Sequence, residues 1–408
     1  MNANHLKKAL ELLAKAVGLF EEGNYAEAMV CLNRADNLQA PLDLIYRYRA
    51  RIYEKTNDAA KAATDYMLAR NFADFHAFEY RVLAGKQLEN IFPDMAYSEY
   101  RDALTMPVNE DEVKEYLRNS ALAYEKKAEE HAKTVLNAAA VWFRSHVGLL
   151  KGHGFSLEGK DVLEIGGSII PMQCLLYLCA GARATAIDKF RSPDNINIVG
   201  PEMQLLCYRY ILENMHNPEI CGEMPCELRR LLPEQVVEKQ DDKIKLVAPD
   251  LNFFYEVDSA SAPFEDCSFD LITSLVTLEH VGDPDGDPMD TVREIARLLR
   301  PGGWSAHNIG LSDHRDIEKK PYDFLQLSDH EWKTFDCDHN QRANRWRASR
   351  WRNAFKEVGL EEIHVINNIE KWPPLSDELL DSFHPDFKCL GREDLEVLDV
   401  TLIHRKPE

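Results

Sequence analysis

KDVLEIGG at residues 160–167 and ARATAID at residues 182–188 are the stretches that decide how the larger part of this chain folds. Each is a short, largely apolar run, the first ended by a glycine pair and the second by an aspartate. Met172–Leu178, between them, has the composition of a buried helix. The order strand, glycine turn, helix, strand and acid predicts a βαβ unit whose turn approaches a nucleotide and whose acid meets ribose hydroxyls.

The alternation of short strands and helices continues towards the C-terminus. Further strands are predicted at Phe253–Val257, Phe269–Ser274, Trp304–Ile309, Ile363–Ile366 and Leu395–Ile403, and a helix over residues 289–299. This pattern predicts a Rossmann-like α/β domain over residues 151–408 with a seven-stranded, mostly parallel sheet. The connections at about 189–252 and 312–352 are longer than a crossover needs, so we expect insertions that build the substrate site.

A series of short motifs accompanies these elements in order. Its members are Glu164-Ile-Gly-Gly167, Asp188, Asp258-Ser-Ala-Ser-Ala-Pro-Phe264, Ser268-Phe-Asp270, Leu278-Glu-His-Val281 and Leu299-Arg-Pro-Gly-Gly303. The series resembles the class I S-adenosylmethionine-dependent methyltransferases over about residues 158–310. A dinucleotide-dependent oxidoreductase shares the glycine turn, but it has no reason to carry the remaining motifs.

The resemblance implies S-adenosylmethionine as cofactor and suggests which residues bind it. The glycine turn would cradle the methionine half, one acid would bind the ribose, a second acid would meet the adenine, and the end of the fourth strand would line the pocket near the methyl group. The residues matched to these roles are Glu164, Gly166, Gly167 and Ser168; Asp188; Asp258 and Ser259; and Ser274 and Leu275. The turn departs from the family pattern, because Ser168 and Ile170 stand where glycines alternate and Pro171 follows them.

Methylation of a hydroxyl requires a base that removes the proton while the sulfonium methyl is attacked in line. His314, just beyond the fifth strand, is our first choice of catalytic residue, followed by Asp313 and His280. A structural role is the alternative for His280, and His307 within a strand is expected to be a core residue. No acidic or histidine cluster has metal-ligand spacing, so the sequence predicts no metal site.

The region after the fourth strand bears on the acceptor. Residues 274–278 lack the Asp/Asn-Pro-Pro-aromatic stretch of amino-nucleobase methyltransferases. Three later stretches resemble methyltransferases of glycan and polysaccharide biosynthesis, which implies a sugar hydroxyl as acceptor: residues 312–316, 322–332 and 344–359. Five arginines at 342, 345, 347, 350 and 352 either hold an anionic sugar or phosphate or form a solvated helix face. Trp332, Trp346 and Trp351 either stack on sugars or, for at least two of them, pack in the core.

The first hundred residues contain a repeat of 34 residues. Three sets of alanines recur with this period, and a bulky residue follows the second set: Ala16, Ala50 and Ala84; Ala28, Ala62 and Ala96; Ala35, Ala69 and Ala103; and Leu32, Tyr66 and Tyr100. Small residues at fixed phase let paired helices approach closely, and this pattern resembles the tetratricopeptide repeat. We predict three repeats over residues 1–110 and a capping or linker helix over 111–150. The array is expected to bind a protein partner or to self-associate.

Charge and composition exclude several classes of protein. The formal net charge of −21 argues against nucleic acid as the main partner, because such a surface needs clustered Lys and Arg. The sequence has no run of about 18 apolar residues, so no membrane span is expected, and its N-terminus does not read as a signal peptide. Nine scattered cysteines predict reduced thiols and a cytoplasmic protein.

These observations lead to a methyltransferase that transfers the methyl group of S-adenosylmethionine to oxygen, with a sugar hydroxyl of a glycan as the expected acceptor. Two alternatives stay open at this stage. One is a protein methyltransferase whose repeats select the substrate. The other is a scaffold that binds the cofactor without catalysis, since the glycine turn is altered.

Overall fold

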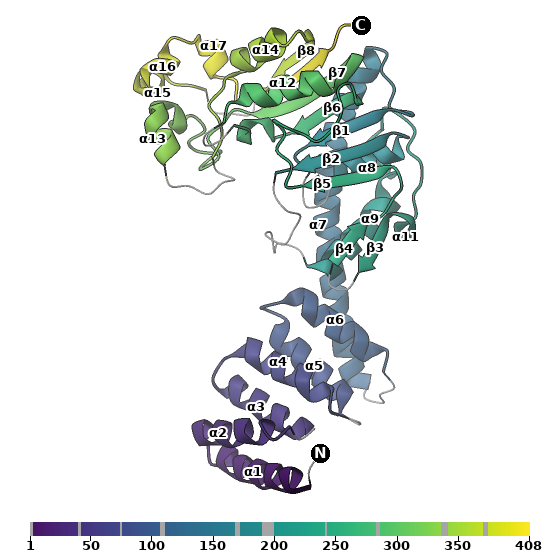
Figure 1. The fold of residues 1–408 in the computed structure, drawn as a ribbon, viewed down its shortest axis with the longest axis vertical. Helices are drawn as coiled ribbons and strands as arrows, with labels where there is room; N and C mark the ends of the chain where they lie inside the picture. The colour runs from purple at the N-terminus through teal and green to yellow at the C-terminus, as the bar shows by residue number, and fades with distance from the viewer. Residues whose placement is uncertain are drawn as a thin grey trace. The chain divides into compact units, whose positions relative to one another are not determined.

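The computed structural model describes residues 3–39, 42–73, 76–106, 111–167, 172–189, 200–240, 243–282, 286–335, 342–369 and 374–408. The chain divides into two compact units, which are labelled by element in Figure 1. Unit 1 comprises Met1–Lys133, Ile198–Tyr210 and Lys239–Ile244, and unit 2 comprises Thr134–Asn197, Ile211–Glu238 and Lys245–Glu408. The long helix α7 (Asp111–Gly152) supplies residues to both.

Unit 1 begins with six helices, each packed on the next along the chain (Figure 1). They are α1 (Ala3–Glu21), α2 (Tyr25–Asp36), α3 (Asp43–Lys55), α4 (Ala59–Arg70), α5 (Ala77–Leu88) and α6 (Pro93–Leu104). All nine alanines of the 34-residue period are buried, and so are the bulky residues Leu32, Tyr66 and Tyr100. The small residues of the period therefore lie in the interior of the array.

The helix starts of this unit follow from local sequence. Asn24 accepts a hydrogen bond from the backbone N–H of Glu27 and caps α2, while Asp58 accepts one from Lys61 and caps α4. Pro93 occupies the first turn of α6, where a missing N–H costs nothing. The starts of α2, α4 and α6 are thus fixed by their own residues.

The first part of α7 covers the end of the array. Tyr124 of α7 stacks on Tyr97 of α6 with ring centroids 4.6 Å apart. Asp94 accepts hydrogen bonds from the Tyr124 hydroxyl at 2.6 Å and from the backbone N–H groups of Glu202 and Met203. These two residues begin α9 (Pro201–Asn214), so the insertion after the second strand supplies residues to both units.

The core of unit 2 is a seven-stranded sheet. Its strands are β1 (Asp161–Ile165), β2 (Arg183–Asp188), β5 (Leu251–Tyr255), β6 (Phe269–Leu275), β7 (Leu299–Gly310), β8 (Glu361–Asn367) and β9 (Asp399–Arg405). The order is β5-β2-β1-β6-β7-β9-β8; β9 pairs antiparallel with both β7 and β8, and the other neighbouring strands pair in parallel. The mostly parallel sheet predicted from the alternating pattern is confirmed. A separate pair is formed by β3 (Val237–Gln240) and β4 (Lys243–Leu246).

Helices cover the sheet and complete its core. The helices α12 (Pro288–Leu298) and α14 (Ala348–Glu357) share one apolar cluster with β1, β6, β7 and β9. The helix α8 (Met172–Cys179) follows β1 and is buried along most of its length. No helix within the described ranges has the length and apolarity that a membrane span requires.

The remaining short helices lie in the connections. They are α10 (Pro218–Cys221), α11 (Pro233–Val236), η1 (Leu278–His280), η2 (Asp323–Gln326), α13 (Asp329–Thr334), α15 (Asp377–Ser382), α16 (Pro385–Lys388) and α17 (Arg392–Leu395). Residues of η2 and α13 pack with residues 375–398 into a second apolar cluster, which contains Phe324, Trp332 and Phe387. The second insertion therefore shares a separate apolar core with the segment between β8 and β9.

Candidate active site

The sheet order contains one switch point, between β1 and β6. The chain proceeds from β1 to β2 and β5 on one side and from β6 to β7 on the other. In open α/β sheets the crevice beyond the carboxyl ends of the strands at such a point receives the ligand. A cavity of about 330 Å³ lies there, within the size range of small-molecule sites. Its lining residues are Ile165, Gly166, Gly167, Ile187, Asp188, Lys189, Val257, Asp258, Ser259, Leu275, Val276, Thr277, His280, Val281 and Gly282.

The turn after β1 requires glycine. Gly166 has φ of +84°, and a Cβ atom there would lie 2.2 Å from the Thr277 hydroxyl oxygen. Its N–H donates to the carbonyl of Ile187, which ties the turn to the end of β2. Val276 opposite also has a positive φ of 43°, which is rare for a β-branched residue. Backbone strain of this kind is concentrated at functional sites.

Two acids predicted for the cofactor lie on the cavity wall. Asp188 ends β2, and Asp258 follows β5 together with Ser259. Asp258 accepts a hydrogen bond from the backbone N–H of Ala260 and lies 3.3 Å from the ammonium of Lys189. Parallel pairing of β2 with β5 therefore brings the two carboxylates to the same edge, as the motif order predicted.

Two other predicted cofactor residues do not line the cavity. The Glu164 carboxylate is buried and accepts a hydrogen bond from the Cys174 thiol at 3.1 Å, and burial raises its pKa to about 7. Ser274 is buried, and its hydroxyl is 2.8 Å from Nδ1 of His307. The alternation of side chains along β1 and β6 turns both residues away from the strand-end crevice. Ser168 lies outside the described residues.

The predicted catalytic residues have three different environments. His280 lines the cavity, and its ring centroid is 5.0 Å from that of His314. Asp313 is buried and forms a bidentate ion pair with Arg315, so it shapes the turn after β7. His307 is fully buried, and burial holds its pKa well below the usual range, which confirms the core role expected for it.

The turn that carries His280 is held by the second insertion. Asn344 donates its side-chain amide to the carbonyls of Leu278 and Val281, and its N–H to the carbonyl of Glu279. Nδ1 of His280 is 2.8 Å from the carbonyl of Arg342, so Nδ1 carries the proton of the neutral ring. This assigns Nε2 as the basic nitrogen of His280.

Glu279 is a feature of the site that the sequence analysis missed. Its side chain is completely buried, one carboxylate oxygen accepts the N–H of Gly310 at 3.2 Å, and burial raises its pKa to about 8. The signal available in the sequence was the acid directly before His280. Several apolar residues that line the cavity, among them Ile165, Val257 and Val276, could not be predicted, because apolar residues at strand ends resemble core residues in the sequence.

The arginines at 342–352 serve the structure of the insertion. Arg347 is buried and donates to the carbonyls of Leu311, Leu395 and Val397, while Arg345 donates to those of Phe324 and Leu327. Arg350 and Arg352 form exposed ion pairs with glutamates, and Arg342 donates to two carbonyls. The alternative of a solvated helix face holds for Arg350 and Arg352 of α14, whereas Arg345 and Arg347 are buried and join segments of unit 2 from inside. Trp332 and Trp351 are buried, as expected for at least two of the three tryptophans.

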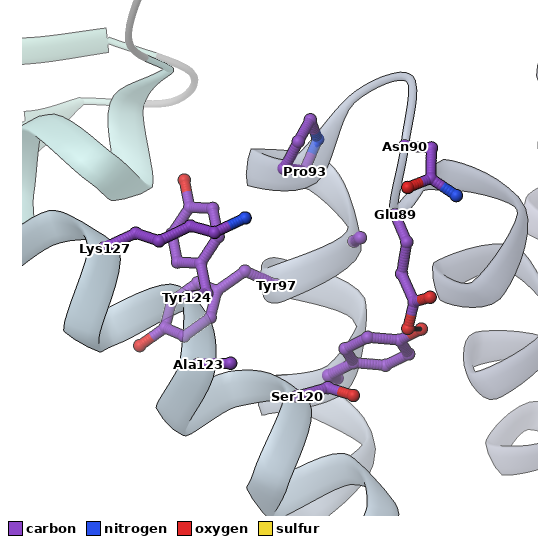
Figure 2. A pocket seen from close by; sticks show the side chains of 10 residues that line it. Glu89, Asn90, Pro93, Tyr97, Ser120, Ala123, Tyr124 and Lys127 are labelled. Atoms are coloured by element: carbon purple, nitrogen blue, oxygen red, sulfur yellow. Dashed lines mark hydrogen bonds between the residues drawn. The ribbon is translucent and has the colours of Figure 1, made fainter.

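A second cavity lies in unit 1, between α6 and α7 (Figure 2). Its volume is about 270 Å³, and Figure 2 shows Glu89 and Lys127 on opposite sides of it. The hydroxyls of Tyr100 and Tyr116 both donate to Glu89. These bonds join the loop after α5 to α6 and α7, so they help to fix the cap of the array.

A comparison with protein families matches a model described as methyltransferase domain to residues 232–306, which include β5, β6 and the first part of β7. No curated protein matches the chain. Together with the cavity at the switch point, the family match defines a class I S-adenosylmethionine-dependent methyltransferase domain. The enzyme's methyl donor is therefore S-adenosylmethionine.

Solved methyltransferases are similar to this chain at low identity. One is the Haloferax volcanii methyltransferase in complex with the Trm112 methyltransferase activator, with 17% identity, 70% of this chain and 98% of that chain covered, and a TM-score of 0.34. Another, from Mesorhizobium loti, has 12% identity, coverage of 66% and 100%, and a TM-score of 0.35. Phosphoethanolamine N-methyltransferase 2 from Haemonchus contortus, solved with S-adenosylmethionine, has 15% identity, coverage of 65% and 52%, and a TM-score of 0.34.

Proposed function

We propose that this enzyme transfers the methyl group of S-adenosylmethionine to a hydroxyl oxygen, and that the acceptor is a sugar hydroxyl of a glycan. The observation that carries the proposal is the position of His280 in the wall of the cofactor cavity, with His314 beside it. Two imidazoles at the site of transfer suit a hydroxyl, which must lose its proton, better than an amine that is already nucleophilic.

Within the cavity, the strand-end residues hold the cofactor. Asp188 binds the ribose diol through charge-assisted hydrogen bonds, and Asp258 with Ser259 meets the adenine edge. The turn at Gly166 and Gly167 leaves its backbone open to the methionine half. Leu275 lies at the end of β6, on the side from which the acceptor approaches.

The transfer step needs a base and an in-line approach. The acceptor hydroxyl gives its proton to an imidazole as its oxygen attacks the methyl carbon, the C–S bond breaks, and the bonding pair returns to sulfur. We assign the proton to the His280–His314 pair, with His314 as the first base. The products are the methyl ether, S-adenosylhomocysteine and a protonated imidazole, which returns its proton to water.

The helical array supplies a docking surface in this proposal. We infer three tetratricopeptide-like repeats over residues 1–110, with residues 111–150 as cap and linker and 151–408 as the catalytic domain. The buried alanine columns support this arrangement. The array would present an acceptor-bearing protein partner, or a second copy of the chain, to the catalytic domain in a reducing, cytoplasmic setting.

The test is to compare variants in cofactor binding and in turnover on a panel of glycans. His314→Ala should bind S-adenosylhomocysteine with wild-type affinity by calorimetry but lose about 10²–10⁴ in rate. His330→Ala, an exposed histidine of the same insertion, is the matched control and should keep full activity. Wild-type turnover on proteins and not on glycans would replace the sugar with a protein acceptor. Cofactor binding without any turnover would instead make the chain a scaffold.

A further inference from the structure

We propose that Glu279, His280 and His314 bind one divalent transition-metal ion at the acceptor side of the cofactor cavity, and that this ion takes the acceptor hydroxyl as a ligand. The inference rests on the proposed O-methyl transfer for the ion's role. The ion site itself rests on the geometry of three side chains. The sequence predicted no metal because Glu279 and His280 are adjacent, while His314 follows 34 residues after His280.

The three ligand atoms converge. One carboxylate oxygen of Glu279 and one ring nitrogen each of His280 and His314 all lie within 4.8 Å of one another. Ligand atoms of a tetrahedral zinc ion are about 3.4 Å apart, because each bond is about 2.1 Å long. Side-chain movements of up to about 0.8 Å therefore bring all three atoms to bonding distance.

The Glu279 carboxylate is a second, independent observation that points to a cation ligand. Oε1 of Glu279 accepts the N–H of Gly310, but Oε2 is buried and has no hydrogen-bond partner among the described residues. Burying a carboxylate oxygen without a partner is costly, and a bound cation removes this cost. The same carboxylate is completely enclosed, so solvent does not satisfy it.

The ring of His280 is oriented as in a metal ligand. Nδ1 donates to the carbonyl of Arg342 at 2.8 Å, which fixes the tautomer and presents Nε2. Metal-binding histidines commonly donate their second ring N–H to a carbonyl or carboxylate in this way. Asn344 holds the turn from the other side, so the position of the ring is set by two contacts with the second insertion.

Two histidines and one carboxylate select the ion and leave room for the acceptor. This donor set suits zinc and iron(II), and it leaves coordination positions open. An acceptor with two neighbouring oxygens, such as a vicinal diol of a sugar, fits two such positions. The bound hydroxyl loses its proton to water at a lower pKa, its oxygen attacks the methyl carbon, and the C–S bonding pair returns to sulfur. In the metal-loaded enzyme the ion activates the acceptor hydroxyl, the role that the His280–His314 pair has as a base in the metal-free protein.

The experiment uses the full-length protein after treatment with a chelator and gel filtration. Zn²⁺ binding is measured by equilibrium dialysis with elemental analysis, and Co²⁺ binding by the appearance of a visible absorption band. The wild type and His330→Ala should each bind one ion per chain at this site. His314→Ala should lose at least tenfold in affinity and should lose the Co²⁺ band, and Glu279→Gln should do the same.

Folding and cofactor binding are followed in parallel, so that loss of metal is separated from loss of structure. His314 is half-buried, and its alanine variant should keep the wild-type circular dichroism spectrum and affinity for S-adenosylhomocysteine. Equal Zn²⁺ affinity in the wild type and His314→Ala overturns the metal site. Full methyl transfer by chelator-treated enzyme also overturns it, while leaving the proposed function intact. If the protein binds the metal but transfers no methyl group to any hydroxyl, the ion site stands and the proposed function fails.

Discussion

Replacing His404 with leucine should make the folded protein less sensitive to acid, and the structure gives the size of the effect. His404 of β9 is completely buried, and the Phe355 ring stacks on it at 4.4 Å. Neither ring nitrogen has a hydrogen-bond partner among the described residues. Burial lowers the pKa of His404 to about 4, so the ring is neutral in the fold near pH 7.

The direction of the pH effect on stability follows from the pKa of His404 in the unfolded and in the folded chain. The unfolded chain binds a proton at a pKa near 6.5, while the folded chain resists protonation until about pH 4. The contribution to stability is therefore complete above about pH 6.5 and is lost as the pH falls from about 6.5 towards 4. Between pH 7 and pH 5 the loss is about 2 kcal/mol, since each unit of difference is worth about 1.4 kcal/mol.

Several other buried groups also make the free energy of unfolding depend on pH. The quantity to measure is therefore the difference in this free energy between variant and wild type. His146, whose pKa burial also lowers to about 4, loses stability over the same window. Glu164 and Glu279 act in the opposite direction, because burial raises the pKa of each carboxyl and acid neutralises it. These contributions are common to both proteins and cancel in the comparison.

The assay is urea unfolding at pH 7, 6 and 5, followed by tryptophan fluorescence. All six tryptophans lie within the sequence ranges of unit 2, so the signal follows the unit that contains His404. The free energy of unfolding of His404→Leu, relative to wild type, should rise by about 2 kcal/mol from pH 7 to pH 5. His330→Ala, an exposed control, should show no such trend. A difference for His404→Leu that does not change with pH would refute the reasoning.

Three further changes test the cofactor site and the helical unit. Asp188→Ala removes the carboxylate proposed for the ribose. Calorimetry should show S-adenosylmethionine binding weakened ten- to a hundredfold, about 1.5–3 kcal/mol. An unchanged affinity would mean that Asp188 does not bind the cofactor. Gly166→Ala places alanine at a positive φ and against Thr277, whereas Gly359 has the same φ of +84° in open space. Gly166→Ala should therefore unfold at a lower urea concentration than Gly359→Ala. Equal midpoints of unfolding would show that the clash is relieved. Asp94→Ala removes the hydrogen-bond acceptor shared by Tyr124 and the start of α9, and it should lower the free energy of unfolding by about 2 kcal/mol. Thermal unfolding is followed by far-ultraviolet circular dichroism. An unchanged unfolding temperature would show that these hydrogen bonds are unimportant.

The sheet and the helical array could be predicted because their signals are local. Gly166 follows β1 directly, β2 ends at Asp188 and β7 ends at Gly310, and apolar runs of this length leave few alternatives. The alanine columns are equally direct, since close helix packing demands small residues at a fixed phase. At Gly85, for example, a Cβ atom would lie 2.3 Å from the ring of Tyr100.

The parts that escaped prediction depend on where side chains point and on contacts between distant segments. Glu164 stands in the right motif, but strand alternation directs its carboxylate towards Cys174. Arg347 carries a charge and so suggests a surface position, yet its guanidinium reaches three carbonyls in the interior. The meeting of His314 with Glu279 depends on the turn after β7, and no spacing in the sequence reveals it.

These contacts place the two proposed tasks, cofactor binding and activation of the acceptor, in different parts of the chain. The ends of β1, β2, β5 and β6 line the cavity proposed for the cofactor, and their conformation is set by the sheet. The turn that carries His280 is instead held by Arg342 and Asn344, which belong to the second insertion. Substitution of Asn344 should therefore lower the rate of methyl transfer more than the affinity for the cofactor. Substitution of Asp188 should do the reverse, because a sheet-anchored site and an insertion-anchored site lose their geometry independently.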